Sequence, residues 1–183
     1  MVVNKEDIQL IQKIAGEKIA TYMSKILENA LGFKVRGVRN YFLKVFCSKN
    51  LGSFITIFKY DSTYGYADHV GFRNGMCHPF KPCSLDGKII SIWEIPPTVM
   101  DTALLKYMDA DAREAFEWMK LLVKKVERVR GVITLLWHNI TFDELIYGNY
   151  AKLYKALLRY FEAQGAWLTS CGELYDYWVE MFK

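Results

Sequence analysis

The sequence has no hydrophobic stretch near the roughly 20 residues that a bilayer-spanning helix needs. The amino-terminal residues, MVVNKEDIQ, also lack the apolar core of a secretory signal peptide. Cysteine is scarce, with four residues scattered among 183. These absences argue against a membrane protein and against a disulfide framework, so we expect a cytoplasmic protein whose thiols are reduced.

A strong excess of one charge is also missing. The net charge is +4, and Lys and Arg alternate with Asp and Glu, so neither nucleic acid nor a membrane is an expected partner. What the chain does contain is hydrophobic residues, at 52%, and aromatic residues, at 15%, which exclude a disordered chain. The length and composition predict a single packed domain over residues 1–183.

The most informative stretch is VITLLWHN, residues 132–139. The apolar run that follows Gly131 is long enough for one buried strand and too short for a typical helix. It ends abruptly in Trp137-His138-Asn139. Because ligands of α/β folds bind at the carboxyl ends of strands, this pattern favours a site at His138. An alternative interpretation is a core strand whose histidine makes a loop hydrogen bond, and the pattern alone does not choose between them.

Hydrophobic periodicity predicts strands that alternate with helices along most of the chain. This order is typical of βα units, and we expect an α/β fold with a mainly parallel sheet. Asp101 is expected to cap a short helix. The predicted strands are residues 54–60, 88–95, 132–136 and 166–170, with short extended pieces at 34–36 and 41–46. The predicted helices are 5–30, 101–108, 111–130, 150 to Gln164-Gly165, and 171–182, and residues 64–83 and 141–148 are predicted loops.

Two further segments carry candidate site residues. Asp61 follows the strand candidate FITIFKY directly, as expected either for a site at a strand end or for an Asx turn. The long segment 64–83 contains Cys77, His78 and Cys83, whose spacing matches no standard zinc motif, so a structural metal there is a minor alternative.

Several of these strings, taken in order, resemble the polysaccharide deacetylases of the NodB-homology type, the family-4 carbohydrate esterases. They are KYDSTYGYADHVGFRNGMCHPF, WEIPPTVMDTAL, GVITLLWHN and GAWLTSCGELYDYW, and the likeness runs from about Leu27 to Trp178. The resemblance implies an incomplete, distorted (β/α) barrel that hydrolyses an N-acetyl group from a carbohydrate. In that reaction a divalent metal polarises the carbonyl and a bound water, a carboxylate takes a proton from the water, and a histidine protonates the leaving amine.

The resemblance also implies roles for individual residues. Leu135-Leu136-Trp137-His138 matches the family's Leu-x-x-His motif, which makes His138 the proton donor. Arg39 matches the arginine that orients the catalytic base, with Arg73 as its competitor, and Asp61 is similar to the carboxylate that orients the histidine. The residues expected to contact the sugar are Arg73, Tyr64, Tyr66, Phe72, Trp93, Trp137 and Asn139.

The chain departs from the family at two motifs. The Thr-Phe-Asp-Asp motif, with the base and a metal ligand, and the His-x-x-x-His pair are both absent, and the chain has only three histidines. The chain therefore resembles the carboxyl-terminal portion of such a domain, starting after the metal site. We expect a zinc-like metal for the family but no ligands for it here, and an isolated chain without activity. The expected partners are a carbohydrate and either a complementing chain or a second copy, which would cover exposed strand edges; the alternative function is non-catalytic carbohydrate binding.

Overall fold

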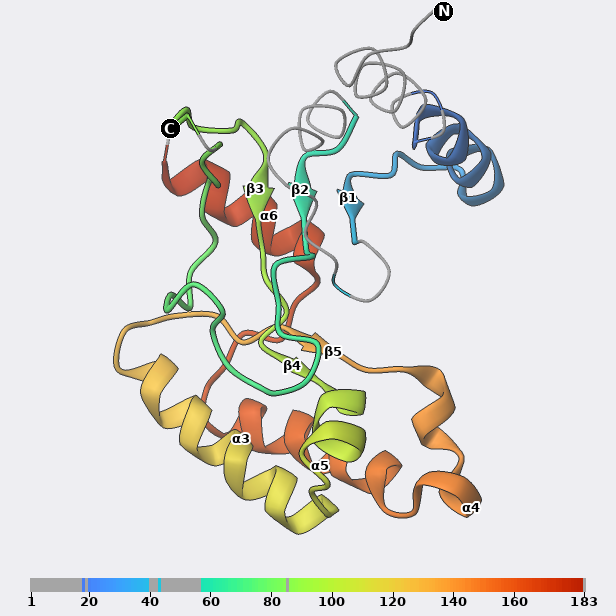
Figure 1. Cartoon of the computed structure of the whole chain (residues 1–183), viewed down its shortest axis with the longest axis vertical. Coiled ribbons are helices and arrows are strands. Elements are labelled where there is room, and N and C mark those ends of the chain that lie inside the picture. Colours follow the sequence, from blue (N-terminus) through green and yellow to red (C-terminus); the bar gives the residue numbers. More distant parts are fainter. Residues whose placement is uncertain (1–17, 19, 40–42, 44–56, 85, 183) are drawn as a thin grey trace, which may run out of the picture.

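The strands form two small parallel sheets. The computed structural model describes residues 18, 20–39, 43, 57–84 and 86–182 (Figure 1). One sheet has the order β1-β2-β3 and the other pairs β4 with β5, and every pairing is parallel. The mixed α/β class with parallel strands is therefore confirmed, and the described residues do not close into a barrel. The strands are β1 (Gly37–Val38), β2 (Tyr60–Asp61), β3 (Trp93–Glu94), β4 (Val99–Met100) and β5 (Leu135–Leu136).

One extended segment links the two sheets. Just beyond β3, the Ile95 amide donates to the Asp61 carbonyl over 2.8 Å, in continuation of the pairing with β2. Three residues later, the Thr98 amide donates to the Thr134 carbonyl over 2.9 Å, and the pairing with β5 begins. The chain thus changes its partner between β3 and β4 without an intervening helix, which fixes the position of β5 relative to the first sheet.

Two of the longer helices begin at reciprocal capping boxes. Asp111 forms one with Glu114 at the start of α3 (Ala112–Glu127), and Ser170 forms one with Glu173 at the start of α6 (Cys171–Met181). Residues 20–31 are also helical and end at Gly32, which has a φ of +74°. After that helix, the helical elements in chain order are the π-helix η2 (Ala103–Tyr107), α3, the 3₁₀-helix η3 (Asn139–Phe142), α4 (Glu144–Tyr147), α5 (Tyr150–Ala163) and α6.

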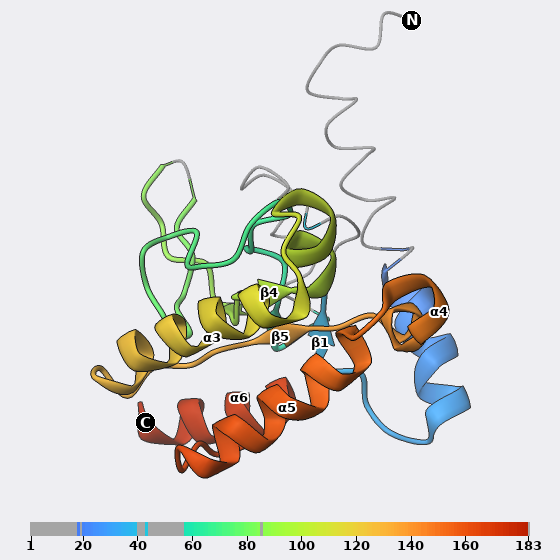
Figure 2. The ribbon, with the colours of Figure 1, turned by 90° about the horizontal axis from the view of Figure 1, so that it is seen from below.

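The main core lies where α3 packs against α5, and Figure 2 shows these two helices on either side of the segment that carries β5. Met119 of α3 and Leu157 of α5 are fully buried there. A second packing layer joins α6 to the three-stranded sheet, with the Tyr60 and Tyr175 rings 5.8 Å apart. None of the helices within the described ranges is long and apolar enough to cross a membrane.

Two predicted elements are wrong. Residues 166–170 form no strand, because this stretch leads into the capping box of α6 at Ser170. The predicted loop 141–148 contains the end of η3 and all of α4, and the Asp143 side chain caps α4 by accepting from the Leu145 amide. Helices α3, α5 and α6 are confirmed within a few residues. The extended piece at 41–46, the first part of the 54–60 strand and the helix before residue 18 lie outside the described residues, apart from Leu43.

Candidate functional site

His138 and Asp101 form a hydrogen-bonded pair at the carboxyl ends of β5 and β4. His138 Nδ1 lies 2.6 Å from Asp101 Oδ1. The Asp101 side chain is fully buried, whereas 40% of the His138 side chain is exposed. A carboxylate accepts hydrogen bonds only, so the proton between the two atoms belongs on Nδ1, and Nε2 of neutral His138 then carries a lone pair. The partly exposed Nε2 has no hydrogen-bond partner among the described residues.

The Asp101 carboxylate is held by four donors. Oδ1 accepts from His138 Nδ1 and from the Thr102 amide at 2.7 Å. Oδ2 accepts from the His138 amide at 2.7 Å and from Thr141 Oγ1 at 2.9 Å. A carboxylate can accept about four hydrogen bonds, so these four donors satisfy both oxygens of Asp101, which water does not reach. The orientation of the imidazole is therefore fixed from its backbone as well as its ring.

Such a pair can transfer protons through Nε2. In the neutral form Nε2 accepts a proton, and in the imidazolium form it donates one, while the bond to Asp101 keeps the ring in a single orientation. The geometry supports general acid–base chemistry at the exposed nitrogen.

Strand pairing explains why the partner of His138 is Asp101. The sequence predicts Asp61 as the carboxylate that orients His138, and this prediction is wrong. Asp61 belongs to β2, whose neighbours are β1 and β3. His138 instead follows β5, whose neighbour is β4, with Met100 opposite Leu136. The next polar residue after β4 is Asp101, so parallel pairing brings it to His138 from 37 positions away. The sequence predicts no strand before Asp101, because β4 is only two residues long, and it therefore predicts Asp101 only as a helix cap.

Asp61 and Arg39 contribute to a second polar cluster at the ends of β1, β2 and β3. Asp61 lies opposite Glu94 in the parallel pairing, and the two carboxyls are 6% and 3% exposed. Glu94 Oε1 accepts from the backbone amides of Thr63 and Tyr64, at 3.0 and 2.8 Å. Arg39 Nε and Nη2 donate to the Ser62 carbonyl and hydroxyl oxygens, at 3.0 and 2.9 Å. The sequence-predicted residues Asp61 and Arg39 are therefore brought together, and Glu94 joins them.

Burial governs the charge of this cluster. Burial, followed by the charge of Asp61, raises the pKa of Glu94 to about 8. Burial also raises the pKa of Asp61, although its hydrogen bond from Thr63 and the charge of Arg39 act in the opposite direction. Two carboxyls on neighbouring strands in a low-dielectric environment favour a state in which one of them stays protonated. Both carboxyls are too deeply buried to touch a substrate directly, so this cluster supports the strand ends.

The predicted sugar-contacting residues fall into different surroundings. Tyr64 carries the Arg73 guanidinium 4.8 Å from its ring centre, and Arg73 Nη1 donates to the Gly65 carbonyl over 3.1 Å. Tyr66 stacks on His69 with 3.7 Å between ring centres. The loop thus carries two contacting pairs, Tyr64 with Arg73 and Tyr66 with His69.

The other three predicted residues, Trp93, Trp137 and Asn139, lie away from these two pairs. Trp93 points to the other face of the sheet, where it lies 6.1 Å from the Phe182 ring. Trp137 packs inward against Tyr154, at 5.3 Å between ring centres. Asn139 is exposed at the start of η3, directly after His138.

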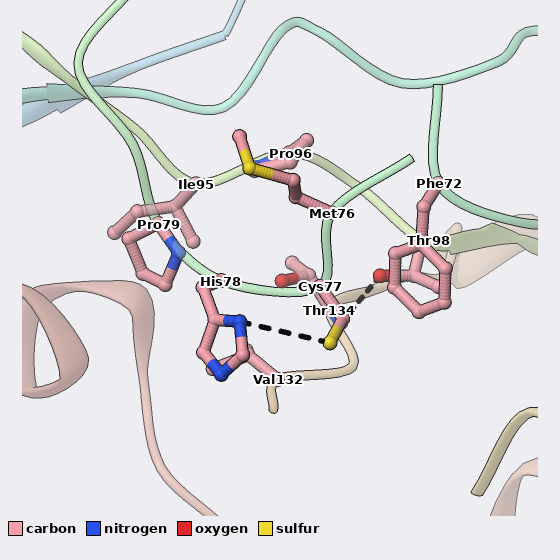
Figure 3. Close-up of a pocket in the computed structure, with 10 residues that line it drawn as sticks. All are labelled: Phe72, Met76, Cys77, His78, Pro79, Ile95, Pro96, Thr98, Val132 and Thr134. Atoms are coloured by element: carbon pink, nitrogen blue, oxygen red, sulfur yellow. Dashed lines mark hydrogen bonds between the residues drawn. The ribbon is translucent and has the colours of Figure 1, made fainter. Parts of the chain in front are cut away.

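Phe72 lines a small apolar pocket with Cys77 and His78 (Figure 3). The pocket volume is about 10 Å³, room for about one water molecule. His78 Nδ1 lies 3.8 Å from Cys77 Sγ, and His78 Nε2 lies 3.2 Å from the Val129 carbonyl, so both ring nitrogens are engaged by the protein. The pocket therefore has the character of a packing gap between the loop and the start of β5.

The described residues do not fit the divalent metal that the resemblance implies. No group of three or more His, Cys, Asp or Glu side chains among them could hold an ion. The donor set around Asp101 is made of N–H and O–H groups, which occupy its oxygens. We therefore derive no catalytic step that passes through a metal.

No protein-family model, no curated protein and no solved structure matches this chain in the comparisons. The site is accordingly interpreted from its own geometry.

Proposed function

We propose that this chain provides the proton-donating part of a carbohydrate N-deacetylase-like domain, built on an incomplete, distorted (β/α) barrel of the NodB-homology type. The observation that carries the proposal is the half-exposed His138 held by the fully buried Asp101 at 2.6 Å. Parallel strands with polar side chains at their carboxyl ends support the barrel-type architecture. The order of motifs around His138 supports the carbohydrate substrate.

The step assigned to this chain is the departure of the amine. Water adds its oxygen to the acetyl carbon, and the carbon–nitrogen bond then breaks to give acetate and a free amino sugar. The His138 imidazolium donates its Nε2 proton to the leaving nitrogen and becomes neutral, with Nδ1–H still bound to Asp101. The base that takes the proton of the water is not assigned to any described residue.

The proposal includes partners outside the described residues. β1 and β5 each pair on one side only among the described strands, so their outer edges are available to a complementing chain or a second copy. Such a partner would supply the base and the metal ligands, and the isolated chain is accordingly proposed to be inactive. The alternative function is carbohydrate binding without catalysis, which the stacked Tyr66 and His69 rings on the loop favour.

Histidine NMR tests the proposal directly. The chain labelled with ¹⁵N-histidine is titrated with an N-acetylated chito-oligosaccharide and with its deacetylated form. We expect the His138 ring signals to move with both. Binding that leaves His138 unmoved but shifts His69 would favour the non-catalytic alternative, and the absence of any shift at millimolar ligand would overturn both.

Acetate release provides the second arm. With added Zn²⁺ or Co²⁺, the chain alone is expected to release no acetate above background. If release occurs, it must fall at least about 100-fold in His138→Asn, the effect of losing a general acid. The matched control is His78→Asn, which removes the exposed contact of His78 Nε2 with the Val129 carbonyl, 3.2 Å away, and is expected to leave acetate release unchanged. Turnover that survives His138→Asn would contradict the role of His138.

A further inference from the structure

Thr141 contacts both members of the His138–Asp101 pair. Its side chain is fully buried, on the 3₁₀-helix η3 that directly follows His138. Thr141 Oγ1 is 2.9 Å from Asp101 Oδ2 and 2.7 Å from the His138 carbonyl oxygen. A hydroxyl has one proton, so it donates to these two acceptors in turn or shares the proton between them. Thr141 is thus the only described side chain other than His138 that bonds to Asp101.

We infer that Thr141 is a positioning residue for the proton-transfer pair, which rests on the function proposed above. Thr141 and the His138 amide both donate to Oδ2, and the Thr102 amide donates to Oδ1, so Oδ1 stays aimed at His138 Nδ1. Without the hydroxyl, one oxygen lone pair of a fully buried carboxylate loses its donor, and Oδ2 is held by the His138 amide alone. We therefore expect a weaker hydrogen bond from His138 Nδ1–H to Asp101 and a mixture of the two neutral imidazole tautomers.

The local structure places the hydroxyl there. The Thr141 amide donates to the His138 carbonyl over 3.2 Å, which closes the first turn of η3. This turn places residue 141 next to residue 138 and next to Asp101, the residue that follows β4. A threonine at this position therefore contacts both members of the pair, whereas its neighbours Ile140 and Phe142 are exposed.

The test compares two substitutions at Thr141 by their effect on the His138 ring. In the wild-type chain, ¹⁵N spectra of His138 are expected to show the Nδ1–H tautomer as the main neutral form, with a low-field Nδ1 proton. In Thr141→Val, which keeps the shape and removes the hydroxyl, we expect this proton signal to broaden or disappear and the Nε2–H tautomer to rise several-fold. Thr141→Ser is expected to restore the wild-type spectrum.

Thr98 provides a matched control. It is also a buried threonine in the same region, and its hydroxyl oxygen accepts from the Thr134 amide over 3.2 Å. Thr98→Val is expected to lower stability without changing the His138 tautomer. A Thr141→Val spectrum identical to that of the wild type, or one changed equally by Thr98→Val, would overturn the inference. Because no sugar is present, this result is independent of whether the proposed substrate is correct.

Discussion

Asp61 and Glu94 face each other across the parallel pair of β2 and β3, and both carboxyls are buried. Side chains that are opposite in register point to the same face, so the two acids meet on the face turned away from α6. Glu94 ties the residues that follow β2 to the sheet through two backbone amides. The charge state of this pair therefore affects the start of the loop that carries Tyr64 and Arg73.

The raised pKa of Glu94 predicts that the free energy of unfolding falls as the pH rises. The pKa of Glu94 is raised from 4.5 to about 8 on folding, so the native state binds more protons than the unfolded state between these values. Stability from this group is complete below about pH 4.5 and is lost as the pH approaches 8. The expected loss is a few kcal/mol, since a tenfold change in proton affinity corresponds to about 1.4 kcal/mol.

Urea unfolding from pH 5 to 9 measures this loss. Glu94→Gln keeps an oxygen acceptor for the two amides and is expected to flatten the slope, leaving the variant more stable than the wild type near pH 9. Glu117→Gln, on the exposed side of α3, is the control and should leave the slope intact. An unchanged slope in Glu94→Gln would contradict the assignment of the titration to this pair.

Asp101→Asn is expected to destabilise the chain by about 2–4 kcal/mol. An amide turns one acceptor into a donor, which then faces the N–H and O–H donors that surround Asp101 in a fully buried position. Thermal unfolding measures the change. The control is Asp176→Asn, which breaks the exposed bond to Arg36 at 2.7 Å and should cost less than about 1 kcal/mol. Equal effects of the two substitutions would contradict the buried role of Asp101.

The interface of α3 with α5 is expected to dominate global stability. Met119→Ala removes a fully buried side chain and is expected to cost about 2–5 kcal/mol through the cavity it leaves. Leu121→Ala, on the same helix, removes a side chain that is 54% exposed and should change stability by less than about 0.5 kcal/mol. Chemical denaturation of both variants provides the comparison, and similar effects would place the core elsewhere.

Gly131 is expected to resist substitution because of Cys77. A Cβ on Gly131 would lie 2.3 Å from Cys77 Sγ, and the Val132 amide donates to the Cys77 carbonyl over 2.7 Å, so the backbones cannot separate freely. Gly131→Ala should therefore cost about 1–3 kcal/mol. In a Cys77→Ala background the sulfur is absent, and the same substitution should cost measurably less. A double-mutant cycle monitored by urea unfolding tests this coupling, and strict additivity would argue against the contact.

Hydrophobic periodicity was sufficient to predict α3, α5 and α6 and a strand before His138. The periodic stripe from Tyr150 to Phe161 predicted α5, because a helix with one apolar face must bury that face, and the structure confirms it. The apolar run before His138 predicted a strand that ends near the histidine, and β5 lies within that run. By contrast, Ala166 to Ser170 has the composition of a strand but has no strand beside it to pair with among the described residues.

The carboxylate that serves His138 depends on contacts between distant parts of the chain. The sequence pattern favours Asp61, which follows a predicted strand, whereas in the structure Asp101 follows the two-residue strand β4 that pairs with β5. The choice depends on which strands pair and in which register, and a parallel pair joins residues that are far apart in the chain. The same holds for Thr141 and Glu94, whose partners lie 40 and about 30 positions away. Local patterns specify local elements, whereas a buried charge finds its donors only when distant strands come together.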